Sequence, residues 1–264
     1  MRISNILLMV IFPTAALAEW ETNMPRGVTP TSEVAYDLHM LIFYITVVIG
    51  IVVFGAMLYS IIYHRKSLGY KPAKFHESTK VEIIWTVIPF IILVGMAVPA
   101  TKALIMMEDT RDSEITLKVT GYQWMWQYEY LEDNVTFFSK IAEESNVARR
   151  LGSGVDVTTV ENYLRDVDHA IVLPINTKVR ILLTANDVIH AWWVPELGGK
   201  KDAIPGYINE IWVDIKEPGT YRGQCAELCG KDHGFMPIVV HAVSKPEYYK
   251  WVGIQKTNKV AKNK

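Results

Sequence analysis

Cysteine is scarce in this sequence, and neither sign of charge dominates. Two cysteines in 264 residues are too few for a disulfide-rich scaffold, so their sequence neighbours must indicate their role. Lysine and arginine total 27 against 28 acidic residues, a formal net charge of -1. A nucleic-acid-binding protein is expected to be basic, so this balance argues against nucleic acid as a partner. No Cys-x-x-Cys-His motif occurs, which excludes a haem attached covalently through that motif.

Charged residues are missing from two long apolar stretches, residues 38–63 and 83–101. Each is long enough to cross the hydrocarbon core of a bilayer as a helix that rises about 1.5 Å per residue. Pro89 and Pro99 would disfavour a helix interior in water, but membrane helices that pack against neighbours tolerate proline. The pattern predicts a two-helix transmembrane hairpin, with spans at about 38–63 and 82–104, inside a segment that covers residues 19–107.

The loop between the two stretches is basic. It contains one acid, Glu77, and Lys or Arg at positions 65, 66, 71, 74 and 80. Positively charged loops stay in the cytoplasm. We therefore expect a two-pass protein of a bacterial-type inner membrane, with both termini in the periplasm.

Residues 1–18 have the features of a secretory signal peptide. Arg2 provides a positive start, residues 6–12 are apolar, and Ala16-Leu17-Ala18 fits the small-x-small cleavage pattern. The apolar run is too short to span a bilayer. A cleaved signal also places the mature N-terminus in the periplasm. The alternative is an uncleaved segment at the membrane surface.

A periplasmic domain is expected over residues 108–264. Short runs rich in Val, Ile, Trp and Tyr alternate with turn residues, which is typical of a β-sandwich or barrel. The candidate strands are residues 115–119, 124–130, 170–173, 179–183, 208–213 and 238–243. Residues 139–166 break this pattern because they are polar and charged. We interpret them as a long inserted loop, with helical turns at residues 160–166.

Metal-ligating side chains gather in residues 225–236. Cys225, Cys229, His233 and Met236 fall within twelve residues, so a loop between two strands can direct all four toward one point. A further His190 lies at the end of an apolar strand. Thiolate and thioether sulfur are soft ligands, and imidazole also suits copper. The group therefore predicts a copper site.

Zinc, a single copper ion and a disulfide are the alternatives. Zinc accepts two Cys and two His, but Met is unusual for it. A blue-copper site needs one Cys, which leaves a second Cys over. An oxidising periplasm favours a disulfide, although a disulfide requires neither His nor Met. Taken singly, His190 would be a satisfied core residue and Met236 a core filler. Two thiolates, two imidazoles and a thioether are enough to bridge and cap two copper ions.

Several motifs together resemble subunit II of the haem–copper cytochrome c oxidases. They follow the family's order and cover nearly all of the chain after the signal: EIIWTVIP (82–89), GYQWMW (121–126), DVIHAWWVP (187–195), KDAIPG (201–206) and GQCAELCGKDHGFM (223–236). The resemblance implies a mainly β periplasmic domain, a cupredoxin-like Greek-key sandwich or barrel, preceded by the two-helix hairpin. It also implies that electrons from reduced cytochrome c pass to haem in subunit I, where oxygen is reduced with proton translocation.

The resemblance also implies a binuclear copper centre, called CuA. The implied ligands are His190, Cys225, Cys229, His233, Met236 and the backbone carbonyl of Glu227. The Glu227 side chain is implied to bind a magnesium ion shared with subunit I, and a carboxylate suits this hard ion. On sequence alone, Glu227 would be a solvated loop residue. Subunits I and III are the expected partners in the membrane.

Further residues match positions that serve electron and proton transfer. Trp124 matches the tryptophan that receives the electron from cytochrome c, whereas strand packing explains Trp126. Because cytochrome c is basic around its exposed haem edge, its docking surface should be acidic. Three acids match docking positions of the family: Glu129, Asp168 and Asp187. Each of them could equally be an ordinary solvated acid.

Glu82 matches a carboxylate at the mouth of a proton pathway into subunit I. An ionisable group at membrane depth indicates function, although a first-turn Glu also simply favours a helix N-terminus. The chain departs from the family pattern at Tyr122, where His is frequent, at Met125, where Tyr is frequent, and at Tyr207, where Arg is usual. These departures affect docking and the contact with subunit I rather than the copper ligands.

Other functions fit the sequence less well. A quinol oxidase subunit of the same fold would lack the copper ligands. A membrane-anchored copper chaperone or storage protein would need neither two spans nor the aromatic motif. A CuA domain that serves nitrogen-oxide reduction is disfavoured by the hairpin and by the motif around Glu82.

Overall fold

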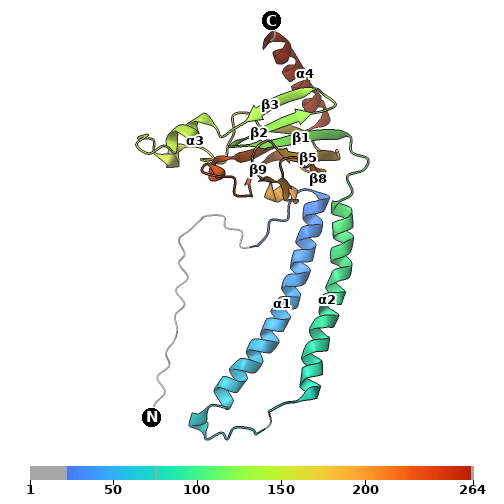
Figure 1. Cartoon of the computed structure of the whole chain (residues 1–264), viewed down its shortest axis with the longest axis vertical. Coiled ribbons are helices and arrows are strands. Elements are labelled where there is room, and N and C mark those ends of the chain that lie inside the picture. Colours follow the sequence, from blue (N-terminus) through green and yellow to red (C-terminus); the bar gives the residue numbers. More distant parts are fainter. Residues whose placement is uncertain (1–22, 75, 263–264) are drawn as a thin grey trace.

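Two long helices lead into a β domain in the computed structural model, which describes residues 23–74 and 76–262 (Figure 1). Helix α1 spans Pro30–Tyr63 and α2 spans Thr79–Met107, and the two lie side by side. Both are long and apolar enough to cross a membrane, and neither apolar stretch is buried by the rest of the described chain. The connection between them contains a short 3-10 helix, η1, at Lys66–Leu68. The expected signal peptide lies outside the described residues.

The start of α1 follows from its sequence. Pro30 occupies the first turn, where its missing N–H costs no hydrogen bond. Thr29 and Ser32 form a capping box: the Ser32 N–H donates to Thr29 Oγ1 over 3.1 Å, and the Thr29 N–H donates to Ser32 Oγ over 3.0 Å. Helix α1 therefore begins well before the charge-free stretch that predicted it.

The ends of both helices are bonded to the β domain. Thr29 Oγ1 donates to the Leu197 carbonyl over 2.9 Å at the start of α1. At the end of α2, the Trp212 indole donates to the Met106 carbonyl over 3.1 Å, and Lys201 pairs with Glu108 over 3.0 Å. These contacts join the hairpin to the β domain.

The strands of the described residues form two five-stranded sheets. The first has the order β3-β2-β1-β5-β8, with bounds Val135–Ser139, Met125–Tyr130, Ile115–Tyr122, Val179–Ala185 and Asn209–Val213. The second has the order β4-β10-β9-β6-β7, with bounds Ile171–Pro174, Pro237–Val243, Gly219–Cys225, His190–Trp193 and Lys201–Ala203. The pairs β1–β5 and β4–β10 are parallel, and the remaining pairs are antiparallel.

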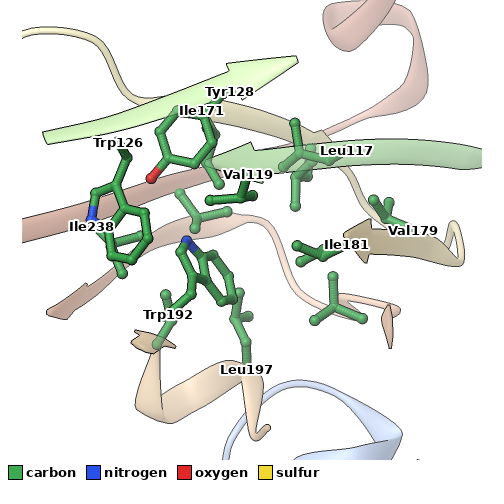
Figure 2. Close-up of a cluster of buried hydrophobic side chains, with 14 of the residues drawn as sticks. Leu117, Val119, Trp126, Tyr128, Ile171, Val179, Ile181, Trp192, Leu197 and Ile238 are labelled. Carbon is green, nitrogen blue, oxygen red and sulfur yellow. The ribbon is translucent and has the colours of Figure 1, made fainter. Parts of the chain in front are cut away.

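The core lies between the two sheets. Burial alternates along β5, as expected for a strand with one face in the core. Figure 2 shows Leu117, Val119 and Ile181 from the first sheet packing toward Trp192 and Ile238 from the second. All five residues are 0% exposed. The expected two-helix hairpin followed by a β-sheet domain is confirmed.

The six predicted strands are present with small shifts at their ends, but β3, β7 and β9 were missed. An apolar strand was expected to end at His190, whereas β6 begins there and runs to Trp193. Strand β9 is polar and contains two glycines, so it lacks the alternation that marks a strand. The packing requires Gly223: a Cβ there would lie 2.0 Å from the Trp193 carbonyl oxygen. The close approach between β9 and β6 therefore requires glycine at position 223.

The inserted segment is more ordered than predicted, and its helix lies elsewhere. Helix α3 spans Glu143–Ala148, and a 3-10 helix, η2, spans Val157–Thr159. Residues 161–165 form turns instead of the predicted helical turns. Asn162 and Leu164 have positive φ values of 47° and 61°, which a right-handed helix cannot contain.

A C-terminal helix, α4, spans Lys245–Lys262 and was not predicted separately from the β domain. It buries Tyr248 and Val252, which are 0% and 4% exposed. The Tyr248 hydroxyl donates to Asp133 over 2.7 Å. Helix α4 therefore covers one end of the sandwich.

Tyr130 links the two sheets, and its removal is expected to destabilise the domain. Its hydroxyl donates to the Val172 carbonyl over 2.9 Å and accepts from the Val172 N–H over 3.0 Å. Tyr130→Phe leaves these buried backbone groups without this partner, so the free energy of unfolding should fall by about 1–3 kcal/mol. Chemical denaturation of the full chain in detergent measures it. Tyr207→Phe, at a side chain that is 59% exposed, is the control, and equal losses in both variants would contradict the assignment.

Candidate metal centre

Strand pairing brings the separate parts of the candidate metal centre together. Cys225 ends β9, and residues 226–236, here called the copper loop, lead into β10. His190 opens β6, which pairs with β9 so that Trp192 lies opposite Cys225. The Cys225 N–H donates to the Met236 carbonyl over 3.1 Å, which closes the base of the loop. Two sheet neighbours and one loop thus supply all five predicted side-chain ligands.

The nitrogen and sulfur atoms of the centre form a short chain. His190 Nδ1 lies 3.9 Å from Cys225 Sγ, the two Sγ atoms are 3.8 Å apart, and Cys229 Sγ lies 3.5 Å from His233 Nδ1. Ligand atoms of His190 and both cysteines lie within 4.8 Å of one another. The order is therefore one histidine beside each sulfur, with the two sulfurs in the middle.

The centre is closed to solvent on the side of the core. His190 is 0% exposed, each cysteine is 3% exposed, and Met236 is 1% exposed. Both cysteines are free thiols in the structure. Soft sulfur and imidazole donors in an apolar, buried setting fit copper.

The electrostatics of the two thiols also favour a bound cation. Burial raises the pKa of Cys225, but hydrogen bonds, chiefly from His190, outweigh it and lower that pKa to about 7. Burial raises the pKa of Cys229, and the neighbouring Cys225 thiolate raises it further. Two adjacent thiolates repel each other in a buried site, so a cation is needed to hold both in the charged form.

Asp187 orients the His190 ring. Its Oδ1 lies 2.9 Å from His190 Nε2, which leaves Nδ1 directed at Cys225. The other oxygen accepts from the Gln123 N–H over 2.7 Å. Partial burial would raise the pKa of Asp187, but the hydrogen bonds from His190 and the backbone outweigh it and lower that pKa. A carboxylate that fixes a ligand imidazole in this way is typical of metal sites.

The side chains of Gln123 and Trp124, between β1 and β2, contact the backbone of the predicted ligand Cys229. The Gln123 amide donates to the Cys229 carbonyl over 2.8 Å, and the Trp124 indole N–H donates to the same oxygen over 3.3 Å. Lys231 lies 5.7 Å from the centre of the Trp124 ring. A partly buried indole is therefore joined by one hydrogen bond to a cysteine of the centre.

Glu227 presents two groups in different directions. Its carbonyl oxygen lies 3.4 Å from Cys225 Sγ. The residue itself is exposed at the tip of the copper loop, beside Leu228, which is 77% exposed. The carbonyl thus faces the centre while the side chain remains available to a partner.

The predicted docking acids already have contacts within the chain. Glu129 pairs with Lys118 over 2.8 Å. Asp168 accepts from the Lys140 N–H over 2.9 Å. Asp187 is hydrogen-bonded to His190 and to the Gln123 N–H. Glu82 lies apart from all of these, in the first turn of α2 at the other end of the hairpin.

None of the positions that depart from the family pattern is a predicted copper ligand. Tyr122 donates to Gln127 over 3.2 Å, Met125 opens β2, and Tyr207 is 59% exposed.

Two residues that support the centre were not singled out from the sequence. Gln123 and Gly121 both belong to the aromatic motif GYQWMW (121–126), in which roles were predicted only for the two tryptophans. A Cβ at Gly121 would lie 2.6 Å from His190 Cδ2, so only glycine leaves room for the ring. A glycine in the motif indicates a close approach of some group, but the sequence does not show that the group is the distant His190 ring.

Gly121→Ala is expected to displace the His190 ring and weaken metal binding. Overpacking of this kind costs about 1–3 kcal/mol of stability, and the strain falls on a predicted ligand. The measurements are the free energy of unfolding and copper retained against a chelator. Gly253→Ala, at an exposed position in α4 outside the copper loop, is the control because no atom lies within 4 Å of a Cβ there. Equal copper retention in both variants would refute the steric argument.

Known proteins share this architecture. Family models match residues 115–243, as cytochrome c oxidase subunit II periplasmic domain, and residues 17–103, as the transmembrane domain of the same subunit. The solved periplasmic domain of subunit II of cytochrome oxidase (CoxB) from Bradyrhizobium japonicum has 37% identity and a TM-score of 0.50, covering 56% of this chain and 98% of that chain.

Curated relatives match over nearly the whole length. A probable cytochrome c oxidase subunit 2 of Rickettsia prowazekii is 42% identical over 92% of this chain and 74% of that protein. The corresponding protein of Rickettsia bellii is 38% identical over 99% and 95%, and cytochrome c oxidase subunit 2 of Arabidopsis thaliana is 36% identical over 94% and 95%. Anchored in a membrane by α1 and α2, this chain belongs to the cytochrome c oxidase subunit II family.

Proposed function

We propose that this chain is the electron-accepting subunit of its oxidase and that it holds two copper ions as a CuA centre. The observation that carries the proposal is the order of the four donor atoms, with two sulfurs between two imidazoles. Because one imidazole lies beside each sulfur, His190 and Cys225 would hold one copper ion and Cys229 and His233 the other. A copper pair in this site would take up and release one electron shared between both ions.

The supporting residues suit fast electron transfer. The donors are held by strand pairing, by the base of the copper loop and by Asp187, so little has to move when the charge changes. Four of the five predicted side-chain ligands are buried, which disfavours the alternative of a copper chaperone that must exchange its metal readily.

Trp124 is the proposed point at which the electron arrives from cytochrome c. Its hydrogen bond to the Cys229 carbonyl supports this role, because it joins a partly buried ring to a ligand residue. Glu129, Asp168 and Asp187 would contribute negative potential to the docking surface. Since their side chains also have contacts within the chain, we assign them long-range attraction rather than individual contacts.

The remaining contacts of the oxidase follow from the exposed groups. The Glu227 carboxylate would hold a magnesium ion together with subunit I, which receives the electron and reduces oxygen. The apolar surfaces of α1 and α2 would face lipid and subunits I and III. Glu82 would lie at the cytoplasmic side, at a proton pathway, and the β domain with both termini would lie in the periplasm.

A copper pair has a distinct magnetic signature. We expect electron paramagnetic resonance of the copper-loaded full chain to show one unpaired electron shared by two equivalent copper nuclei. Cys225→Ser should abolish this shared signal, since one of the two thiolates that would hold the ions is lost, and leave at most the pattern of a single copper. Met125→Leu, in the adjacent β2, is the control. A single-copper pattern in the unaltered chain would refute the binuclear proposal.

Replacing Trp124 should separate electron arrival from metal binding. Trp124→Phe removes the indole N–H, so the rate of reduction by cytochrome c should fall by at least about tenfold, or about 1.4 kcal/mol in the barrier. Copper content should stay unchanged. Stopped-flow reduction of the purified oxidase measures the rate, with Trp193→Phe, 37% exposed in the original side chain, as control. An unchanged rate would remove Trp124 from the proposed route.

A further inference from the structure

The inserted segment reaches the copper loop through one side chain, Arg149. Its guanidinium pairs with Asp232, with Nη1–Oδ1 and Nη2–Oδ2 distances of 3.3 and 3.5 Å. Its Cζ also lies 4.2 Å from the centre of the Phe235 ring. His233 opens a short 3-10 helix, η4, which spans His233–Phe235. Asp232 directly precedes this helix, and Phe235 ends it. A single arginine therefore holds both flanks of a metal ligand.

The two ligand histidines are held in different ways. His190 is fixed through its own ring by Asp187. His233 directs Nδ1 toward Cys229, but within the described part of the chain its Nε2 has no hydrogen-bond partner. Its orientation then depends on the backbone turn that carries it, in which the Phe235 N–H donates to the Asp232 carbonyl over 2.9 Å.

Arg149 is itself held in position. It follows α3, and its Nε donates to Asn146 over 3.0 Å. The Leu164 N–H donates to Ser145 Oγ over 3.1 Å, and the Ala142 N–H donates to the Asp166 carbonyl over 2.9 Å. These bonds close the inserted segment on itself, so the guanidinium is presented from an ordered base.

The ion pair is better shielded than a typical surface pair. The side chains of Arg149 and Asp232 are 22% and 19% exposed. Exposed pairs contribute little because water and salt screen them. Here the two terminal nitrogens of the guanidinium face both carboxylate oxygens, and its Cζ lies over the Phe235 ring. Lysine can reproduce the charge but not this geometry.

We propose that Arg149 is a positioning residue for the metal centre: through Asp232 and Phe235 it fixes the turn that presents His233 to the second copper. The inserted segment thereby restricts the conformation of the part of the copper loop that carries His233. This inference rests on the proposed binuclear centre. It assigns a role in the metal site to a segment that lies outside every ligand motif.

The test compares Arg149→Ala, Arg149→Lys and Asp232→Asn in the copper-loaded full chain, purified in detergent. Arg150→Ala is the matched control, because it removes the same charge from the exposed neighbouring position. Loss of copper to a chelator should be about tenfold faster in Arg149→Ala, in line with other residues that orient metal ligands. Arg149→Lys should fall between this variant and the unaltered chain, and the control should stay within about twofold.

Electron paramagnetic resonance distinguishes positioning from mere stabilisation. In Arg149→Ala and Asp232→Asn, the two copper nuclei should become inequivalent, because the ligand at one end alone is disturbed. Lower stability with an unchanged spectrum and unchanged copper loss would overturn the proposal, as would equal effects of Arg150→Ala. If Arg149→Ala does not fold, Arg149→Lys and Asp232→Asn decide by the same criteria. A missing two-copper signal in the unaltered chain would instead refute the binuclear centre itself.

Discussion

Two buried sulfur atoms held 3.8 Å apart without a bond between them are the constraint on which the rest of this structure depends. Burial and mutual repulsion make a pair of thiolates costly. The fold meets this cost by placing an imidazole beside each sulfur and by closing the loop between β9 and β10. The sandwich is thus a frame that keeps donors at fixed positions with few degrees of freedom.

The same frame fixes the centre relative to the membrane and to the surface. Helices α1 and α2 are bonded to the domain through Thr29 and Trp212 at their upper ends. Asp187 joins the His190 ring to the backbone that leads into Trp124, and Trp124 returns to Cys229. Hydrogen bonds and the Gln123–Trp124 peptide bond therefore connect a ligand histidine, the partly buried tryptophan and a ligand cysteine.

Much of the fold could be predicted because its signals are local. Charge-free stretches marked both helices, and Val-rich and Ile-rich runs marked the inner strands. The copper site was readable because four of its five predicted side-chain ligands fall within twelve residues. Strand β9 escaped because its residues are polar and mostly not buried, and because close packing against Trp193 requires glycine at position 223. Gly121 and Arg149 escaped for another reason: their partners, His190 and Asp232, are far away in sequence and meet them only in the folded chain.

The central claim concerns what joins the two sulfur atoms, and native mass spectrometry of this chain, released intact from the purified oxidase, tests it most directly. The account predicts a mass that includes a pair of copper ions, with Cys225 and Cys229 both recovered as reduced thiols after the metal is removed. A copper-free chain with a covalent Cys225–Cys229 bond would contradict it.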